Sequence, residues 1–152
     1  MIDINNESGI SVDEKSLVLT AAYVLKELRI HPQVDLSILL VDEPTMAHYH
    51  ETFMDLPGPT DVLSFPMDEL RVPKPGQPAP TGILGDIVLC PAVTIEQASE
   101  HGRAPADEAE YLLVHGLLHL LGYDHATQEE HDEMFALNDR LIRDWNRARA
   151  KS

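Results

Sequence analysis

The sequence has little cysteine, few aromatic or basic side chains and no long hydrophobic run. Its one cysteine, Cys90, excludes an intramolecular disulfide and is typical of a reducing compartment. No stretch is long and apolar enough to span a bilayer, and the first residues lack the basic and apolar segments of an export signal. We therefore expect a cytoplasmic protein in which residues 1–152 form a single domain.

Basic residues are scarce, because 11 Lys and Arg face 26 Asp and Glu, for a formal net charge of −15. Taken alone, this balance disfavours nucleic acid as a partner, since affinity for phosphates comes mainly from Lys and Arg. Five of the bases nevertheless lie in the last thirteen residues, namely Arg140, Arg143, Arg147, Arg149 and Lys151. This end is either a locally positive surface or a solvated helix face with a frayed tail.

Three of the eight histidines are closely spaced. His115 and His119 lie four residues apart in a predicted apolar helix, so their imidazoles share one face and can bind one ion. Gly122 can adopt a positive φ and end the helix, which lets His125 reach the same ion from the following loop. Three imidazole ligands suit Zn²⁺ and leave a coordination position for water, as in catalytic sites. The alternative is that His115 and His119 are core histidines and His125 lies on the surface.

The remaining pattern predicts the element order βαβαββααα. Strands are expected at 2–5, 35–42, 60–65 and 83–90, and helices at 11–29, 44–54, 91–101, 107–121 and from 127 onward. Capping-box signals are Ser11 with Glu14, Asp107 with Glu110, and Thr127 with Glu130. This order predicts an α+β fold, in which a small mixed β-sheet packs with helices around a zincin-like central metal-site helix.

Apolar residues at helical spacing predict which helix faces are buried. On the metal-site helix the face opposite the histidines carries Leu113, Leu117, Leu120 and Leu121. On the last helix the inner face carries Met134, Leu137, Leu141 and Trp145. Cys90 ends an apolar run and is interpreted as a small core residue rather than a nucleophile.

Residues 67–82 hold four prolines and two glycines, a composition typical of a mobile or polyproline-like loop. A solvated loop is favoured over a lid that faces a substrate.

The chemistry of a three-histidine zinc site is hydrolysis by a zinc-bound water. Zinc peptidases place a glutamate base directly after the first histidine, but here that residue is Gly116. Asp124 is the first candidate for a catalytic carboxylate or a turn acceptor, and Asp86, Glu43 and Asp61 are further candidates. The remaining histidines lack ligand spacing and are interpreted as surface residues: His31, His48, His50, His101 and His131.

Three segments together resemble the bacterial YbeY family, with the lead-in at 54–59 similar to its actinobacterial branch. They are the run from His115 to His125, Pro-Thr-Asp-Val-Leu-Ser-Phe-Pro at 59–66, and Leu-Gly-Asp-Ile at 84–87. The resemblance implies a cytoplasmic, zinc-dependent, single-strand-specific endoribonuclease that matures the 3′ end of small-subunit ribosomal RNA and acts in ribosome quality control. It also implies zinc ligation by His115, His119 and His125, and as partners ribosomal RNA, a small-subunit protein and the GTPase Era.

One residue departs from the family pattern. Many members have an arginine five residues before the proline of Pro-Thr-Asp-Val, where this chain has Met54. Either another base, such as Arg71 or Arg103, replaces it, or affinity for RNA is weak. The net charge of −15 and Met54 favour an alternative function, a non-catalytic ribosome assembly factor that zinc stabilises. A zinc peptidase is the weakest hypothesis, because Gly116 replaces the glutamate base.

Overall fold

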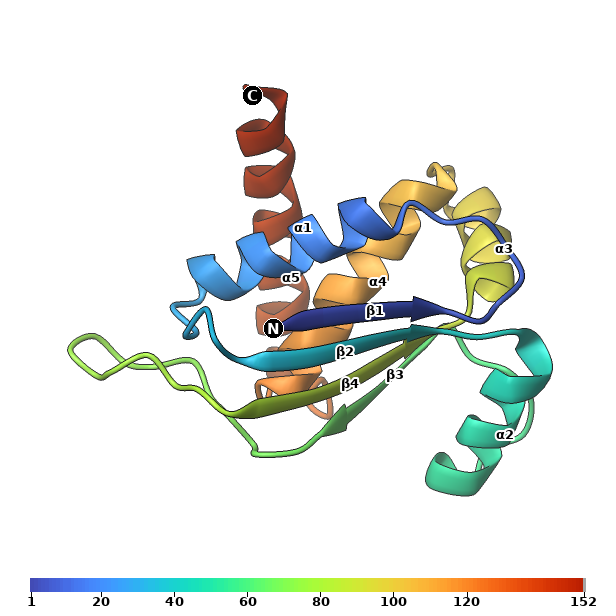
Figure 1. Cartoon of the computed structure of the whole chain (residues 1–152), viewed down its shortest axis with the longest axis horizontal. Coiled ribbons are helices and arrows are strands. Elements are labelled where there is room, and N and C mark those ends of the chain that lie inside the picture. The colour runs from blue at the N-terminus through green and yellow to red at the C-terminus, as the bar shows by residue number, and fades with distance from the viewer. Residues whose placement is uncertain (152) are drawn as a thin grey trace.

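A computed structural model describes residues 1–151 of the chain (Figure 1). Within these residues it has four strands, β1 (Ile2–Asn6), β2 (Asp35–Leu40), β3 (Val62–Pro66) and β4 (Ile83–Leu89). The same residues form five helices, α1 (Glu14–Glu27), α2 (Glu43–Met54), α3 (Pro91–His101), α4 (Pro105–Leu120) and α5 (Gln128–Ala150). The predicted α+β class and element order are both confirmed.

The four strands form one mixed sheet in the order β1-β2-β4-β3. The pairs β1–β2 and β2–β4 are parallel, and β3 runs antiparallel to β4. Strands β1 and β3 are therefore the two edges of the sheet. Figure 1 shows α1, α4 and α5 together on one side of the sheet. Helix α2 lies past one end of the sheet, away from the long loop between β3 and β4.

Helix α4 is central, because it packs against β3 and β4 below and against α1, α3 and α5 around it. The four leucines predicted to face the core are each at most 2% exposed, namely Leu113, Leu117, Leu120 and Leu121. On α5, Met134 and Leu141 are buried, whereas Leu137 and Trp145 are half-buried. The predicted inner faces of both helices are thus confirmed, as is the burial of Cys90.

The predicted start of α1 is wrong by two residues. Asp13, not Ser11, is the N-cap, and its carboxylate accepts a hydrogen bond from the backbone N–H of Ser16. A carboxylate is an equally good cap, and here it lies nearer the first helical residue. The capping box of Thr127 with Glu130 at α5 is confirmed.

The predicted cap of α4 is also wrong. The helix begins at Pro105, before Asp107, because a proline at the first helical position supplies a suitable φ and needs no N–H partner. Glu110 is buried rather than capping, and its carboxylate accepts hydrogen bonds from Ser16 Oγ and Arg149. The prediction therefore failed because two distant partners hold Glu110.

The proline-rich segment 67–82 extends past one end of the sheet as a loop (Figure 1). Arg29 Nη2 donates to the carbonyl of Pro73 at 2.9 Å, and the N–H of His31 donates to Pro80 at 2.9 Å. Leu70 and Val72 pack against the core. The loop is thus attached to the α1–β2 connection.

Among residues 1–151, none of the helices combines the length and apolar character needed to cross a membrane.

Candidate metal centre

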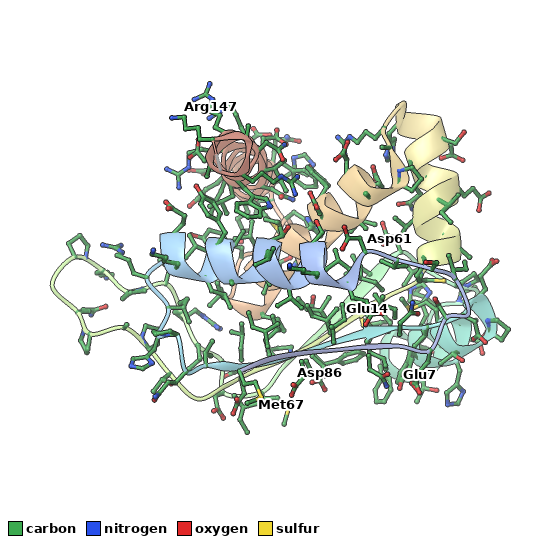
Figure 2. The ribbon with its side chains drawn as sticks, turned by 45° about the horizontal axis from the view of Figure 1, so that its top comes forward. Glu7, Glu14, Asp61, Met67, Asp86 and Arg147 are labelled. Carbon is green, nitrogen blue, oxygen red and sulfur yellow. The ribbon has the colours of Figure 1, made fainter. Side chains whose placement is uncertain are left out.

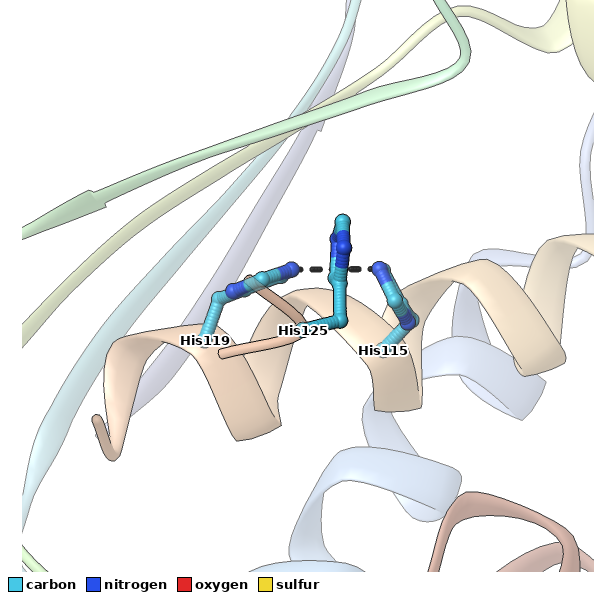
Figure 3. A group of neighbouring side chains, drawn as sticks. All are labelled: His115, His119 and His125. Atoms are coloured by element: carbon cyan, nitrogen blue, oxygen red, sulfur yellow. Dashed lines mark hydrogen bonds between the residues drawn. The ribbon is translucent and has the colours of Figure 1, made fainter. Parts of the chain in front are cut away.

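His115, His119 and His125, the histidine cluster, point their rings into one space (Figure 3). One nitrogen from each ring lies within 4.8 Å of the others, and Nε2 of His115 is 3.1 Å from Nε2 of His119. His115 and His119 come from successive turns of α4, and His125 comes from the loop after it. The three side chains can therefore hold a metal ion.

The turn after α4 brings His125 back to the helix. Gly122 has a φ of 94°, which favours glycine, and the N–H of Tyr123 donates to the carbonyl of Leu118. The carbonyl of Tyr123 lies 3.0 Å from Nδ1 of His119. Because a carbonyl only accepts, Nδ1 of His119 carries the hydrogen and Nε2 keeps its lone pair toward the cluster. The predicted role of Gly122 is confirmed.

Burial favours the neutral form of His115 and His119. The pKa of His115 is lowered to about 4, first by burial and then by the charges of His119 and His125. Burial also lowers the pKa of His119. Nδ1 of His115 is buried and has no hydrogen-bond partner among the described residues, which leaves its Nε2 as the atom facing the cluster. Neutral imidazoles are the form that binds metal, so the donor set fits Zn²⁺.

Gly116 allows α4 to lie close to the sheet. A Cβ at this position would meet Ser64 Oγ at 3.1 Å, Ile87 Cγ2 at 3.2 Å and Val62 Cγ2 at 3.3 Å. Ser64 Oγ also donates to the carbonyl of Gly116 at 3.0 Å. Packing thus accounts for glycine where zinc peptidases have their glutamate, because a longer side chain would displace α4 from β3 and β4.

The histidine cluster opens into a cleft of about 1140 Å³, which residues of β3, α3, α4 and α5 line. Of the candidate carboxylates, Asp61 and Asp124 line this cleft. Asp86 does not, because it lies on the face of the sheet away from α4 (Figure 2). Glu43 is in the first turn of α2, also outside the cleft.

The two cleft carboxylates differ in exposure. Oδ1 of Asp61 accepts the N–H of Val62 at 2.7 Å, and Oδ1 of Asp124 accepts the N–H of His125 at the same distance. Asp61 is half-buried and its charge acts on His115, whereas Asp124 is exposed in the turn and its charge acts on His119. Each candidate carboxylate thus lies near one histidine of the cluster.

The family model described as Endoribonuclease YbeY matches residues 2–146. The chain belongs to the YbeY family. An endoribonuclease YbeY from Cutibacterium acnes is 62% identical over 146 residues, covering 96% of this chain and 94% of the relative. One from Thermobifida fusca is 54% identical, with 97% and 95% covered. The solution structure of TM1509 from Thermotoga maritima matches with a TM-score of 0.65 at 27% identity, covering 99% of this chain and 93% of the other.

The family and the actinobacterial likeness predicted from the motifs are therefore confirmed. The curated relatives carry the name of an RNA-cleaving hydrolase, which agrees with the expected enzyme class.

At the position where many YbeY sequences have arginine, Met54 lines the cleft and is 53% exposed. Arg103 also lines the cleft, and its guanidinium lies 4.5 Å from the centre of the Tyr111 ring. Arg71 lies at the other end of α4, where its guanidinium covers the position that a Cβ of Gly122 would occupy. Of the two arginines named from the sequence as replacements for the missing one, Arg103 lines the cleft, and Arg71 lies against Gly122, which lines it.

A buried carboxylate that sequence reasoning missed also lines this YbeY cleft. Glu108 is 1% exposed and accepts bonds from His101 Nδ1 at 3.0 Å and Arg103 Nη1 at 3.2 Å. His101 is exposed, as predicted, yet it is part of the cleft wall. The sequence places Glu108 on the same helical face as Tyr111 and His115, which is a signal for a cleft residue. Its partners His101 and Arg103 come before α4, so helical spacing alone does not reveal that it is paired.

Phe135 of α5 closes another side of the cluster. Its ring centroid lies 5.4 Å from that of His115 and 6.2 Å from that of His125. His131 stacks on Phe135 at 4.3 Å and is exposed, as predicted. An apolar ring beside imidazoles excludes water from that side and helps to keep them neutral.

Proposed function

We propose that this chain is a zinc-dependent endoribonuclease that cleaves single-stranded RNA. The observation that carries the proposal is the cluster of three histidines in an open cleft. The name of the family and of its curated relatives supports an RNA substrate. We further propose, from the family resemblance, a cytoplasmic role in maturing the 3′ end of small-subunit ribosomal RNA and in ribosome quality control. A small-subunit protein and the GTPase Era are the proposed partners.

Nε2 of His119, Nε2 of His115 and a ring nitrogen of His125 would hold the zinc ion. When bound, zinc supplies Lewis-acid polarisation of a phosphoryl oxygen and lowers the pKa of water. The bond from His119 to the carbonyl of Tyr123 fixes the imidazole orientation, and carboxylate or carbonyl partners of this kind are typical of metal-binding histidines.

Arg103 and Arg71 would bind the RNA phosphates on either side of the cluster. A guanidinium carries five N–H donors, so Arg103 can hold Glu108 and a phosphate at once. The ring of Tyr111 beneath it keeps the guanidinium plane in place. These two bases offset the acidic charge of the chain near the substrate and take the role of the arginine that Met54 replaces.

Asp61 is the proposed proton acceptor. The N–H of Val62 and the hydroxyl of Thr60 both donate to its Oδ1, which fixes the carboxylate at the cleft wall. It can accept a proton from water or from a ribose 2′-hydroxyl.

Cleavage of a labelled single-stranded RNA tests the proposal, together with metal analysis of each protein. His115→Ala and His119→Ala should lose the zinc and slow cleavage by about two orders of magnitude or more, because each removes a third of the donor set. His48→Ala removes an exposed histidine of α2 and is the control. Equal nicking by all four proteins would reject the enzymatic proposal.

The second candidate is a ribosome assembly factor in which zinc only stabilises the fold. The net charge of −15 and Met54 favour it, because an acidic surface suits basic ribosomal proteins. It predicts that chelation unfolds the protein and that the zinc-loaded protein shows no turnover. Gly116, which packs against β3 and β4, argues against a zinc peptidase, and chelator-sensitive cleavage of casein would revive that function.

A further inference from the structure

A second groove continues from the histidine cleft between α4 and the C-terminal half of α5. It has a volume of about 630 Å³, and Arg103 and Tyr111 line both it and the cleft. Its wall on the side of α5 includes Arg143 and Arg147. We name it the α4/α5 groove.

Basic side chains are concentrated along this groove. Arg143 and Arg147 are exposed and lie four residues apart, so both are on one face of α5. Figure 2 shows Arg147 projecting from α5 on the side away from the sheet. With Arg103, three arginines line a groove of a chain that has 11 bases in total.

Two acidic residues, Asp107 and Asp139, also line the groove, so its local charge is positive but modest. Asp107 lies within electrostatic range of Arg149, whose guanidinium is bound to Glu110. With three arginines and two aspartates, the groove is less acidic than the chain as a whole.

The aromatic and apolar parts of the groove have the right chemistry for unpaired bases. Tyr111 is half-buried at the junction with the cleft, and Ile142 lies beside the arginines. Proteins that bind single-stranded nucleic acid combine a basic groove for the backbone with rings on which bases stack.

We propose that the α4/α5 groove binds the backbone of single-stranded RNA beyond the phosphate that is cleaved. The strand enters the cleft at Tyr111 and Arg103, and Arg143 and Arg147 bind phosphates outside it. This inference rests on the proposed function, since it takes the cleft as the place of cleavage.

The test measures binding of fluorescent 2′-O-methyl RNA of about 4 and about 16 nucleotides to the zinc-loaded protein over a range of salt. The double variant Arg143→Gln/Arg147→Gln should bind the long RNA about tenfold more weakly, with a salt slope reduced by about 1.4, because two phosphate contacts to a single strand are lost. The short RNA, which the cleft alone accommodates, should lose far less affinity.

Lys15→Gln/Lys26→Gln is the matched control, because it removes the same charge from exposed positions on α1. The inference is overturned if the two double variants weaken the long RNA equally, if the arginine variant binds it like the unmodified protein, or if that protein binds neither RNA. It is also overturned if a polyglutamate peptide binds the groove as tightly as RNA, which would assign the groove to an acidic polypeptide.

Cleavage assays separate this inference from the proposed function. If the unmodified protein binds long RNA through Arg143 and Arg147 but never cleaves it, the nuclease proposal fails and the groove inference holds. If it cleaves RNA and the arginine variant shows no length-dependent loss of affinity, the groove inference alone fails.

Discussion

Helices α4 and α5 pack against each other but are built in opposite ways. Of the 16 residues of α4, nine are buried, whereas α5 buries three of its 23, Met134, Asn138 and Leu141. Packing on several sides therefore fixes α4, which carries His115 and His119. Helix α5 is held at a few positions, so its other side chains are available for solvent and, in our proposal, for RNA. The difference separates residues that position the histidine cluster from residues that, in our proposal, bind RNA.

The largest expected effect is on the core face of α4. Leu113→Ala should lower the free energy of unfolding by about 2–5 kcal/mol, because this side chain is fully buried and its loss leaves a cavity. Leu137→Ala on α5, at a half-buried position, should cost about 1 kcal/mol. Urea unfolding of both variants measures the difference, and equal losses would show that the two helices are held alike.

The second effect concerns the ion pair that joins the two helices. Arg149→Ala leaves the carboxylate of Glu110 buried at 4% exposure without the guanidinium that donates to it at 2.9 and 2.6 Å. The expected loss is about 1–3 kcal/mol, below that of a fully buried pair because the Arg149 side chain is 32% exposed. Arg147→Ala, two residues away and exposed, should change stability by no more than about 0.5 kcal/mol. A loss in Arg147→Ala as large as in Arg149→Ala would refute the role of the pair.

The smallest effect is a pH dependence of the metal-free protein. Folding lowers the pKa of His115 to about 4, so between its ordinary pKa and pH 4 the unfolded chain binds a proton that the folded one does not. Stability should therefore fall as the pH drops through this window, by on the order of 1–2 kcal/mol from this group. His115→Gln should flatten the dependence in urea titrations, and His131→Gln on α5 is the control. Identical curves for both variants would contradict the assignment to His115.

Local signals predicted α4 and its turn well. The spacing of His115 and His119, the glycine at 122 and the apolar leucines all act within a few residues, where helix geometry alone decides which side chains meet. The same holds for the capping box of Thr127 with Glu130.

Partners that are distant in sequence could not be predicted. Ser16 and Glu110 are 94 residues apart, and Arg149 reaches Glu110 from 39 residues further along. The local pattern therefore predicts a capping role for Glu110, and for Arg149 a place in a positive end or a solvated face. The strand order β1-β2-β4-β3, which decides that Asp61 faces α4 and Asp86 does not, depends on pairing across the whole chain. The local sequence pattern carries no information on the partners of Glu110 or on the order of the strands.

The order in which the donor residues occur along the chain has a consequence for biosynthesis. His125 immediately precedes the cap of α5 at Thr127, and Phe135 and Arg149 of that helix contact the cluster and Glu110. A nascent polypeptide that stops within α5 thus contains all three imidazoles but lacks the contacts that anchor its last segment. The packing around a site that can hold an ion is therefore complete only after the last turns of α5 are made.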